Sequence, residues 1–223
     1  MKNLREYFPF WDSLSDEQKR KLESSVQERF YKKGDTIHNG SEDCIGLLLV
    51  LSGQIRVYTM SDEGKEITLY RLLERDMCLF SASCIIRSIE FDVLVSAELD
   101  STVYIIPPVL YRSLMESSAP VANYTNELMA SHFSEVMWLM DKLLSKKLDS
   151  RLAAFLLEES GLSGSDVLTI THEQIAGHLG SLREVVSRIL KYLESEGMIR
   201  LGRGSITLTD KARLSALGSP SMR

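Results

Sequence analysis

The sequence lacks several features that mark specialised classes of protein. It has only three cysteines in 223 residues, and such an odd, small number argues against a disulfide framework and fits a reducing compartment. No stretch approaches the roughly 18 consecutive apolar residues of a membrane-spanning helix. The opening residues, MKNLREYFPFWDS, carry charges and no sustained apolar run, so they do not resemble a secretory signal. These absences together predict a cytoplasmic protein.

The chain also lacks an excess of positive charge. Its formal net charge is −5, with 26 Lys and Arg against 31 Asp and Glu. This argues against a uniformly basic binder of nucleic acid, although a local basic patch stays possible. With 44% hydrophobic and 26% charged residues, the composition is that of an ordinary globular protein that can bury a core.

The first half of the chain predicts a short helical segment followed by β structure. Ser15 can cap a helix over DEQKRKLESSVQERF, with Leu22 and Val26 facing inward. Residues 30–107 then contain short β-prone runs such as CIGLLLVLSGQIRVYTM, EITLYRLL and STVYIIP, and SDEG at 61–64 predicts a hairpin turn. Several short strands separated by turn signals predict an antiparallel sandwich or barrel.

After Pro107 and Pro108 the apolar residues follow a helical period. Five of them are spaced by 4, 3, 4 and 3 positions, a heptad seam that is typical of a helix pairing with a second copy of itself. We therefore predict a dimerisation helix over 121–147. The alternative is a core helix packed on the β region. The residues of the predicted dimer interface are Met129, Phe133, Val136, Met140 and Leu143.

The segment THEQIAGHLGSLREVVSRILKYLESEG predicts two short helices joined by a tight turn. Thr171 with Gln174, and Ser181 with Glu184, both have the spacing of a capping box. Gly180 lies where a left-handed residue would end the first helix. Helix, glycine-containing turn and helix form the helix-turn-helix arrangement.

The second of these helices presents residue types that suit the edges of base pairs. Arginine can bond guanine at two atoms, glutamate can accept from cytosine, and serine can bond bases or phosphate. MIRLGRGSITL predicts a hairpin, or wing, with an arginine at its tip. Between positions 181 and 213, seven basic and four acidic residues leave +3 in a chain of −5, the local charge that DNA binding needs. The alternative is an ordinary solvated helix face. The predicted DNA-binding residues are Thr171, Ser181, Arg183, Glu184, Ser187, Arg188, Lys191 and Arg203.

The sequence resembles the family of the cyclic-AMP receptor protein and the fumarate–nitrate regulator (Crp/Fnr) over nearly its whole length. The resemblance is most specific in ITHEQIAGHLGSLREVVSRILKYLESEGMI and GRGSITLTD. It implies an α+β fold with a cyclic-nucleotide-binding-like β jelly-roll sensor domain (1–120), the dimerisation helix (121–147) and a C-terminal winged helix-turn-helix domain (148–223). It also implies a homodimer that binds an inverted repeat of double-stranded DNA, with RNA polymerase as a partner if the protein activates transcription.

The resemblance assigns roles to four of the candidate residues. Arg183, Glu184 and Arg188 match the family's base-reading positions. Ser187 beside Arg188 resembles the fumarate–nitrate branch, whose half-sites resemble TTGAT.

The predicted sensor domain departs from the nucleotide-binding members of the family. Those members carry a G-E-L-A helix and an Arg-Ser or Arg-Thr pair that hold the nucleotide, where this chain has RDMCLFSASCII and EFDVLVSAEL. Phe80 falls near the ribose-binding glutamate, and Phe91 and Asp92 fall near the phosphate-binding pair, where Asp92 would repel a phosphate. We therefore predict that cyclic AMP is not the effector. Three cysteines, none of them in the first 40 residues, do not match the four-cysteine iron–sulfur branch either.

The stretch CLFSASC keeps several interpretations open. A thiol switch between Cys78 and Cys84 or with Cys44, a zinc site, haem on His38, His132 or a cysteine, and plain packing of small side chains all fit its composition. We predict no bound cofactor. We also predict that effector binding or thiol oxidation shifts the contacts between the β domain and the central helix, and that a hinge near 145–149 then reorients the DNA-binding domain. The candidate effector residues are Cys78, Phe80, Ser81, Ser83, Cys84, Val136 and Met137.

Two other functions stay as alternatives. A cupin-type metalloenzyme would need clustered histidine and glutamate ligands on the strands, but the β region has only His38. A DNA-binding regulator with a purely structural β domain would differ from the leading interpretation in showing no ligand-dependent change in DNA affinity. We predict no catalytic residues, no metal ligands and no enzymatic activity.

Overall fold

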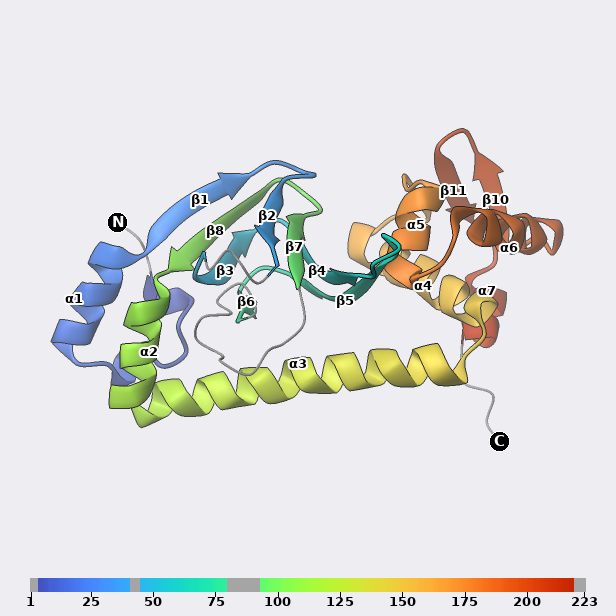
Figure 1. Cartoon of the computed structure of the whole chain (residues 1–223). Coiled ribbons are helices and arrows are strands. Elements are labelled where there is room, and N and C mark those ends of the chain that lie inside the picture. The colour runs from blue at the N-terminus through green and yellow to red at the C-terminus, as the bar shows by residue number, and fades with distance from the viewer. Residues whose placement is uncertain (1–3, 41–44, 80–92, 219–223) are drawn as a thin grey trace. The chain divides into compact units, whose positions relative to one another are not determined.

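A computed structural model describes residues 4–40, 45–79 and 93–218 of the chain (Figure 1). The chain divides into two compact units, which we call the first unit (1–60 with 69–136) and the second unit (61–68 with 137–223). Among the described residues, no helix combines the length and the apolar character that crossing a membrane requires.

The first unit contains two antiparallel sheets. Their strand orders are β1-β8-β3-β6 and β2-β7-β4-β5, and antiparallel ladders join β8 to β1 and β3, and β7 to β2 and β4. Two such sheets enclosing a core confirm the predicted antiparallel β fold. The strands are β1 (Gln27–Tyr31), β2 (Thr36–Asn39), β3 (Leu47–Ser52), β4 (Ile55–Met60), β5 (Glu66–Leu72, whose first residues fall in the second unit), β6 (Met77–Cys78), β7 (Leu94–Ala97) and β8 (Ser101–Ile106).

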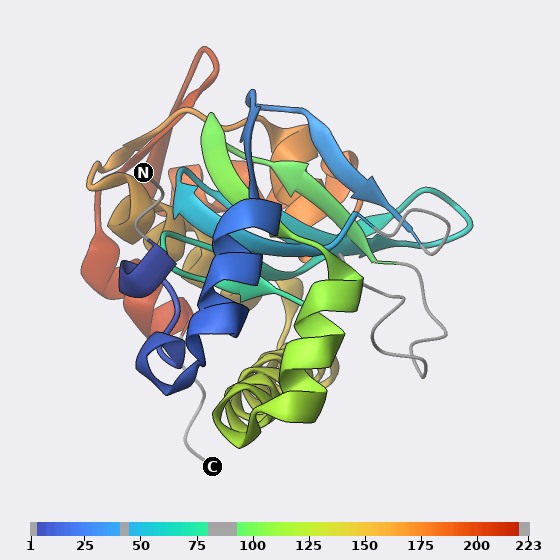
Figure 2. The same cartoon turned by 90° about the vertical axis from the view of Figure 1, so that its left-hand side faces the viewer.

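Short helices precede and follow these strands. They are the 3-10 turns η1 (Leu4–Glu6) and η2 (Trp11–Ser13) and the helices α1 (Asp16–Ser25) and α2 (Pro108–Ser117). Figure 2 shows α1 and α2 side by side.

Helix α1 begins as predicted but ends earlier. The Ser15 capping box is present, with the N–H of Gln18 donating to Ser15 Oγ at 3.2 Å and the N–H of Ser15 donating to Gln18 Oε1 at 2.8 Å. The predicted helix through Phe30 is wrong, because Gln27 already begins β1, which pairs with β8. Tertiary pairing here overrides the helical pattern of the sequence.

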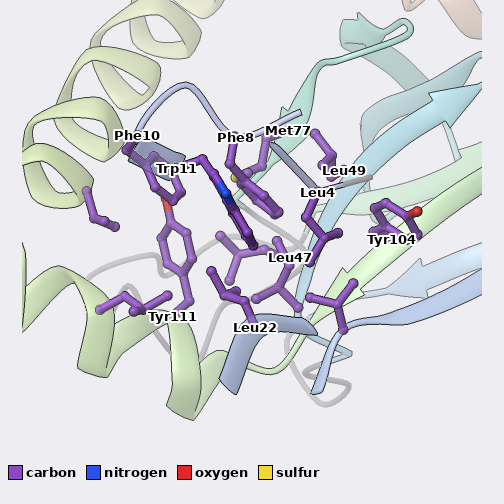
Figure 3. Close-up of a cluster of buried hydrophobic side chains, with 14 of the residues drawn as sticks. Leu4, Phe8, Phe10, Trp11, Leu22, Leu47, Leu49, Met77, Tyr104 and Tyr111 are labelled. Carbon is purple, nitrogen blue, oxygen red and sulfur yellow. The ribbon is translucent and has the colours of Figure 1, made fainter. Parts of the chain in front are cut away.

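The run LLLVL at 47–51 lies in a strand that is buried on both faces. Leu48 and Val50 of β3 belong to the core between the two sheets. Leu47 and Leu49 belong to a second cluster, which Figure 3 shows gathered with aromatic side chains of the N-terminal segment such as Phe8. A strand covered on both sides reads as a continuous apolar run, which explains why this stretch does not alternate.

Helix α3 (Ala119–Ser145) has 27 residues, so it is about 40 Å long at 1.5 Å per residue. Its buried residues are Val121, Thr125 and His132, and Tyr111 of α2 shares a 2.8 Å hydrogen bond with Thr125. Burial raises the pKa of Tyr111 to about 12. Large apolar side chains of the same helix stay exposed when the chain is alone, with these exposed fractions: Met129 37%, Phe133 67%, Met137 47%, Trp138 63%, Met140 47%, Leu143 37% and Leu144 84%.

The second unit is a small helical domain with a three-stranded sheet of order β10-β11-β9. Apolar residues from α4, α5, α6 and α7 meet in one cluster that includes Leu156, Ile175 and Leu190. This is the predicted winged helix-turn-helix. Its elements are α4 (Leu148–Ser163), β9 (Val167–Leu168), α5 (His172–Leu179), α6 (Arg183–Ser195), β10 (Ile199–Gly202), β11 (Ser205–Leu208) and α7 (Lys211–Gly218).

Candidate nucleic-acid interface

The first helix of the helix-turn-helix starts and ends as the sequence predicts. The N–H of Gln174 donates to Thr171 Oγ1 at 3.2 Å and the N–H of Thr171 donates to Gln174 Oε1 at 2.9 Å, which completes the capping box of α5. Gly180 ends the helix with φ 63° and ψ 41°, a left-handed conformation that glycine adopts without strain. The turn between α5 and α6 is therefore fixed by local chemistry.

The start of α6 differs from the prediction. Its N-cap is Leu182, with no side-chain capping bond, so the predicted Ser181–Glu184 capping box is wrong. The N–H of Ser181 donates to the carbonyl of Ala176 at 3.0 Å and so helps to close the end of α5. Ser181 thus belongs to the turn, and α6 begins at Arg183, with Glu184 in its first turn.

Helix α6 has one buried and one polar face. Val186, Leu190 and Leu193 are fully buried, which anchors the helix in the core of the second unit. Positions that are one, four, five and eight residues after Arg183 lie on the opposite side of the helix. We call this side the recognition face, and its residues are Arg183, Glu184, Ser187, Arg188 and Lys191.

The charges of the recognition face are available to a partner. Arg183, Glu184, Arg188 and Lys191 are exposed. Among the residues that the structure describes, the three basic side chains form no ion pair with a carboxylate. Cations that are free of protein partners within the described chain can bond the phosphates of DNA or the acceptor atoms on the edges of bases.

Ser187 is the exception on this face, because it is half-buried and already bonded. Its Oγ lies 2.8 Å from Nδ1 of His172, the first residue of α5. Sequence reasoning assigned no function to His172, and no local signal joins two residues that are 15 positions apart. The helix-turn-helix geometry alone brings them together.

The wing follows α6 as predicted, with one more strand than expected. Gly202 pairs with Ser205 across the tip, so Arg203 is one of the two residues of the turn, and it is exposed. The N–H of Leu201 donates to Glu194 Oε1 at 2.7 Å, which ties the wing to the end of α6. β9 pairs with β11 and broadens the wing into a three-stranded sheet; its two residues are too few to give a periodic signal.

Three polar contacts link the elements of this unit. Arg151 of α4 donates through Nη2 to the carbonyl of Leu179, at the C-terminus of α5, at 2.5 Å, where a cation also complements the helix dipole. Burial lowers the pKa of Arg151. Asp166 accepts a 2.9 Å hydrogen bond from Ser160 and pairs with Lys211, and these two partners, Lys211 first, hold the pKa of Asp166 below its usual value.

The first unit contains a different kind of polar site, made of Tyr70, Cys78 and His132, which we call the interior cluster. The rings of Tyr70 and His132 stack at 4.4 Å between centroids and 9° between planes. Burial raises the pKa of Tyr70 well above its ordinary value, and Cys78 and Glu135 raise it further. All three members of the cluster are buried.

His132 joins α3 to the β structure. Its Nε2 lies 3.3 Å from the carbonyl oxygen of Met77 in β6, and its Nδ1 lies 3.2 Å from Glu135 one turn along α3. The sequence marked His132 only as a packing residue or as one possible haem ligand, and it did not mark Tyr70 at all.

The predicted effector residues are only partly placed. Cys78 is buried in β6, Val136 is half-buried on α3, and Met137 is 47% exposed. The other predicted effector residues and Cys44 lie outside the described residues; the former are Phe80, Ser81, Ser83 and Cys84. Within the described part of the chain, no three His, Cys, Asp or Glu side chains are grouped so as to hold a metal ion.

Comparison with known proteins matches both units. Residues 28–118 match the model of the cyclic nucleotide-binding domain, and residues 150–217 match the Crp-like helix-turn-helix domain. A crystal structure of a putative transcriptional regulator of the Crp/Fnr family from Eubacterium rectale has 55% sequence identity and a TM-score of 0.94, over 96% of this chain and 99% of that one.

Two curated proteins are similar over most of their lengths. The cyclic AMP receptor protein of Thermus thermophilus is 27% identical over 209 residues, which cover 94% of this chain and 96% of that protein. The fumarate and nitrate reduction regulatory protein of Salmonella typhimurium is 28% identical over 216 residues, which cover 92% of this chain and 84% of that protein.

Proposed function

Because this chain belongs to the Crp/Fnr family of transcriptional regulators, we propose that it binds an inverted repeat of DNA as a homodimer in the cytoplasm, and that a signal in its β domain changes its affinity for DNA. The observation that carries the proposal is the recognition face, where exposed cations, unpaired within the described part of the chain, stand on a helix whose other side is fully buried. Such a helix can enter the major groove without disturbing the fold.

The wing adds a second set of contacts. Arg203 at the tip of the β10–β11 hairpin is exposed, and an arginine in this position suits a phosphate beside the groove. Phosphate contacts supply affinity and register, whereas the recognition face supplies specificity. Following the resemblance of Ser187 and Arg188 to the fumarate–nitrate branch, we propose half-sites similar to TTGAT.

Helix α3 supports the homodimer. Its predicted seam residues are partly exposed in the single chain, with Phe133 at 67% and Met140 at 47%. Apolar side chains in a heptad spacing pack into the matching holes of a second helix. A two-fold dimer through α3 would present two recognition faces to successive major grooves about 34 Å apart.

The interior cluster supports a sensing β domain. His132 contacts Tyr70 of β5 and the carbonyl of Met77 in β6, while it belongs to the helix that we propose as the dimer interface. An effector that binds better to one arrangement of this contact than to another would shift the equilibrium between two states of α3. We propose that the effector is not cyclic AMP, because Phe91 and Asp92 fall near the positions of the pair that holds the phosphate in nucleotide-binding members of the family, and Asp92 would repel a phosphate. RNA polymerase would be a further partner if the protein is an activator.

A DNA-binding regulator with a purely structural β domain is the second candidate. It is favoured by the burial of the interior cluster, since all three side chains are covered in the single chain. The two candidates differ in whether DNA affinity changes with metabolites, metals or redox conditions.

A test of the proposal compares binding of the full-length protein to a fluorescent duplex with two inverted TTGAT half-sites, to one half-site, and to a scrambled duplex. We expect the protein to sediment as a dimer and to bind the inverted repeat more tightly than either control. Phe133→Asp places a charge in the seam and should give a monomer that binds the inverted repeat no better than one half-site. Ser134→Asp, which adds the same charge at an exposed neighbouring position, is the matched control and should stay dimeric. Equal affinity of the wild-type protein for all three duplexes would contradict the proposal.

A further inference from the structure

We propose that His172 is a positioning residue for base recognition, which determines through its hydrogen bond which chemical group the hydroxyl of Ser187 presents to DNA. The inference rests on the proposed function, because it assumes that the recognition face contacts base pairs. It assigns a part in specificity to a residue that stands on α5, outside the recognition helix.

Helices α5 and α6 each fix one partner of this contact. His172 follows the Thr171 cap directly, and the capping box with Gln174 fixes the first turn of α5. Ser187 lies on the second turn of α6, one residue after the fully buried Val186. The 2.8 Å distance between Nδ1 of His172 and Oγ of Ser187 therefore joins two rigid elements.

The chemistry of serine makes the contact consequential. A hydroxyl group has one proton to donate and two lone pairs that accept. If Nδ1 of His172 carries no proton, it accepts the proton of Ser187, and the oxygen then offers only lone pairs to DNA. Such an acceptor selects the amino groups of cytosine or adenine in the major groove.

The opposite arrangement favours the opposite base edges. If Nδ1 carries a proton, it donates to the oxygen of Ser187, and the hydroxyl proton stays available for N7 or O6 of guanine or O4 of thymine. In the first case His172 takes up the only proton of Ser187, and in the second case it occupies one of the two lone pairs, so in either case His172 narrows what Ser187 can offer to DNA. A serine without this neighbour can rotate and bond both kinds of edge, so it would discriminate less.

A phosphate contact by His172 is the competing role, since a residue at the start of a helix can also face the DNA backbone. The two roles differ in what they change. A phosphate contact affects all sequences equally, whereas a positioning residue affects the preference at one base pair of each half-site.

The test measures the affinity of the full-length protein for duplexes in which each base pair of the half-site is replaced in turn by the other three. The variants are His172→Phe, Ser187→Ala, the double variant and Arg188→Ala. We expect His172→Phe and Ser187→Ala to reduce the preference at the same base pair by about 2- to 10-fold, the size of one net hydrogen bond. The double variant should lose no more than either single one, and Arg188→Ala should affect a different base pair.

His172→Asn separates positioning from packing, because the amide can occupy the place of Nδ1 and bond Ser187. We expect it to keep part of the preference that His172→Phe loses, with thermal melting of both variants close to the wild type. Unchanged preference in His172→Phe, or a uniform loss across all duplexes, would overturn the inference while leaving the proposed function intact. A wild-type protein with no sequence preference at all would instead overturn the proposed function.

Discussion

The two units place their polar functional groups in opposite settings. The recognition face takes all its residues from one helix, α6, and leaves its charges exposed and unpaired within the described chain. The interior cluster takes its residues from β5, β6 and α3 and buries all of them. The first arrangement suits an external polyanion, and the second suits coupling between parts of the protein itself.

This difference has consequences for substitution. Exposed side chains can be changed with little effect on the fold, typically within about 0.5 kcal/mol, so a variant of the recognition face reports on binding. Buried polar side chains are bonded to their surroundings, and their removal affects stability first. Variants of the recognition face should therefore change DNA affinity, whereas variants of the interior cluster should change the free energy of unfolding.

The largest effect is expected where α6 meets its own core. Leu190 is fully buried opposite the recognition face, and Leu190→Ala should lower the free energy of unfolding by about 2 to 5 kcal/mol because it leaves a cavity. DNA binding should fall with it, since the helix loses its support. Urea denaturation followed by circular dichroism measures the change. Tyr192→Ala, at a 51% exposed position of the same helix, is the control and should leave the unfolding midpoint nearly unchanged.

The next largest effect is a loss of DNA affinity without a change in the free energy of unfolding. Arg188→Ala should weaken binding to the preferred duplex by about 1 to 3 kcal/mol and relax the preference at one base pair. Fluorescence anisotropy with single base-pair replacements measures both quantities. Arg20→Ala, an exposed arginine of α1, is the matched control. An equal loss on every duplex would show that Arg188 contacts phosphate.

The interior cluster should behave in the opposite way. His132→Ala removes the stack on Tyr70 and the bond to the carbonyl of Met77, and we expect the free energy of unfolding to fall by about 1 to 3 kcal/mol. Base preferences should not change, because no member of the cluster belongs to the recognition face. Ser131→Ala, its exposed neighbour, should have little effect. A changed base preference in His132→Ala would break the separation between the two sites.

The same contrast explains how far the sequence could predict the molecule. The helix-turn-helix and the wing of the second unit could be predicted from the sequence, because a cap, a turn glycine and a hairpin are local signals. The Thr171 capping box and the left-handed Gly180 are both present. The start of α6 was predicted one residue too early, because Ser181 still belongs to the turn that closes α5, where its N–H bonds the carbonyl of Ala176.

Contacts between residues far apart in the sequence could not be predicted from local sequence signals. The antiparallel β fold was predictable from short strands and turns, but the end of α1 was not, because β1 is defined by its pairing with β8. Tyr70 and His132 meet only after β5 and α3 have folded, and so do His172 and Ser187 across the helix-turn-helix. No spacing of residues in the sequence predicts that either pair is in contact.

The smallest effect on stability is expected at an exposed ion pair within the second unit. Asp166 lies between α4 and β9 and pairs with Lys211 of α7 while it accepts a bond from Ser160. Because these partners lower the pKa of its carboxyl group from 3.8 in the folded state, the ionised form stabilises the fold. That contribution is present above the pKa of the unfolded chain and is lost as the pH falls through the lower pKa of the folded state.

The substitution Asp166→Asn removes this titration. The variant should unfold at a slightly lower urea concentration than the wild type at pH 7. The difference should shrink as the pH falls from about 3.8, where the carboxyl group of the unfolded chain takes up its proton, through the lower pKa of the folded state. Glu173→Gln, at an exposed position of α5, controls for the loss of a surface charge. A difference that stays constant from pH 7 to acid would show that the introduced amide disturbs the packing of α7, and that the ion pair itself contributes nothing.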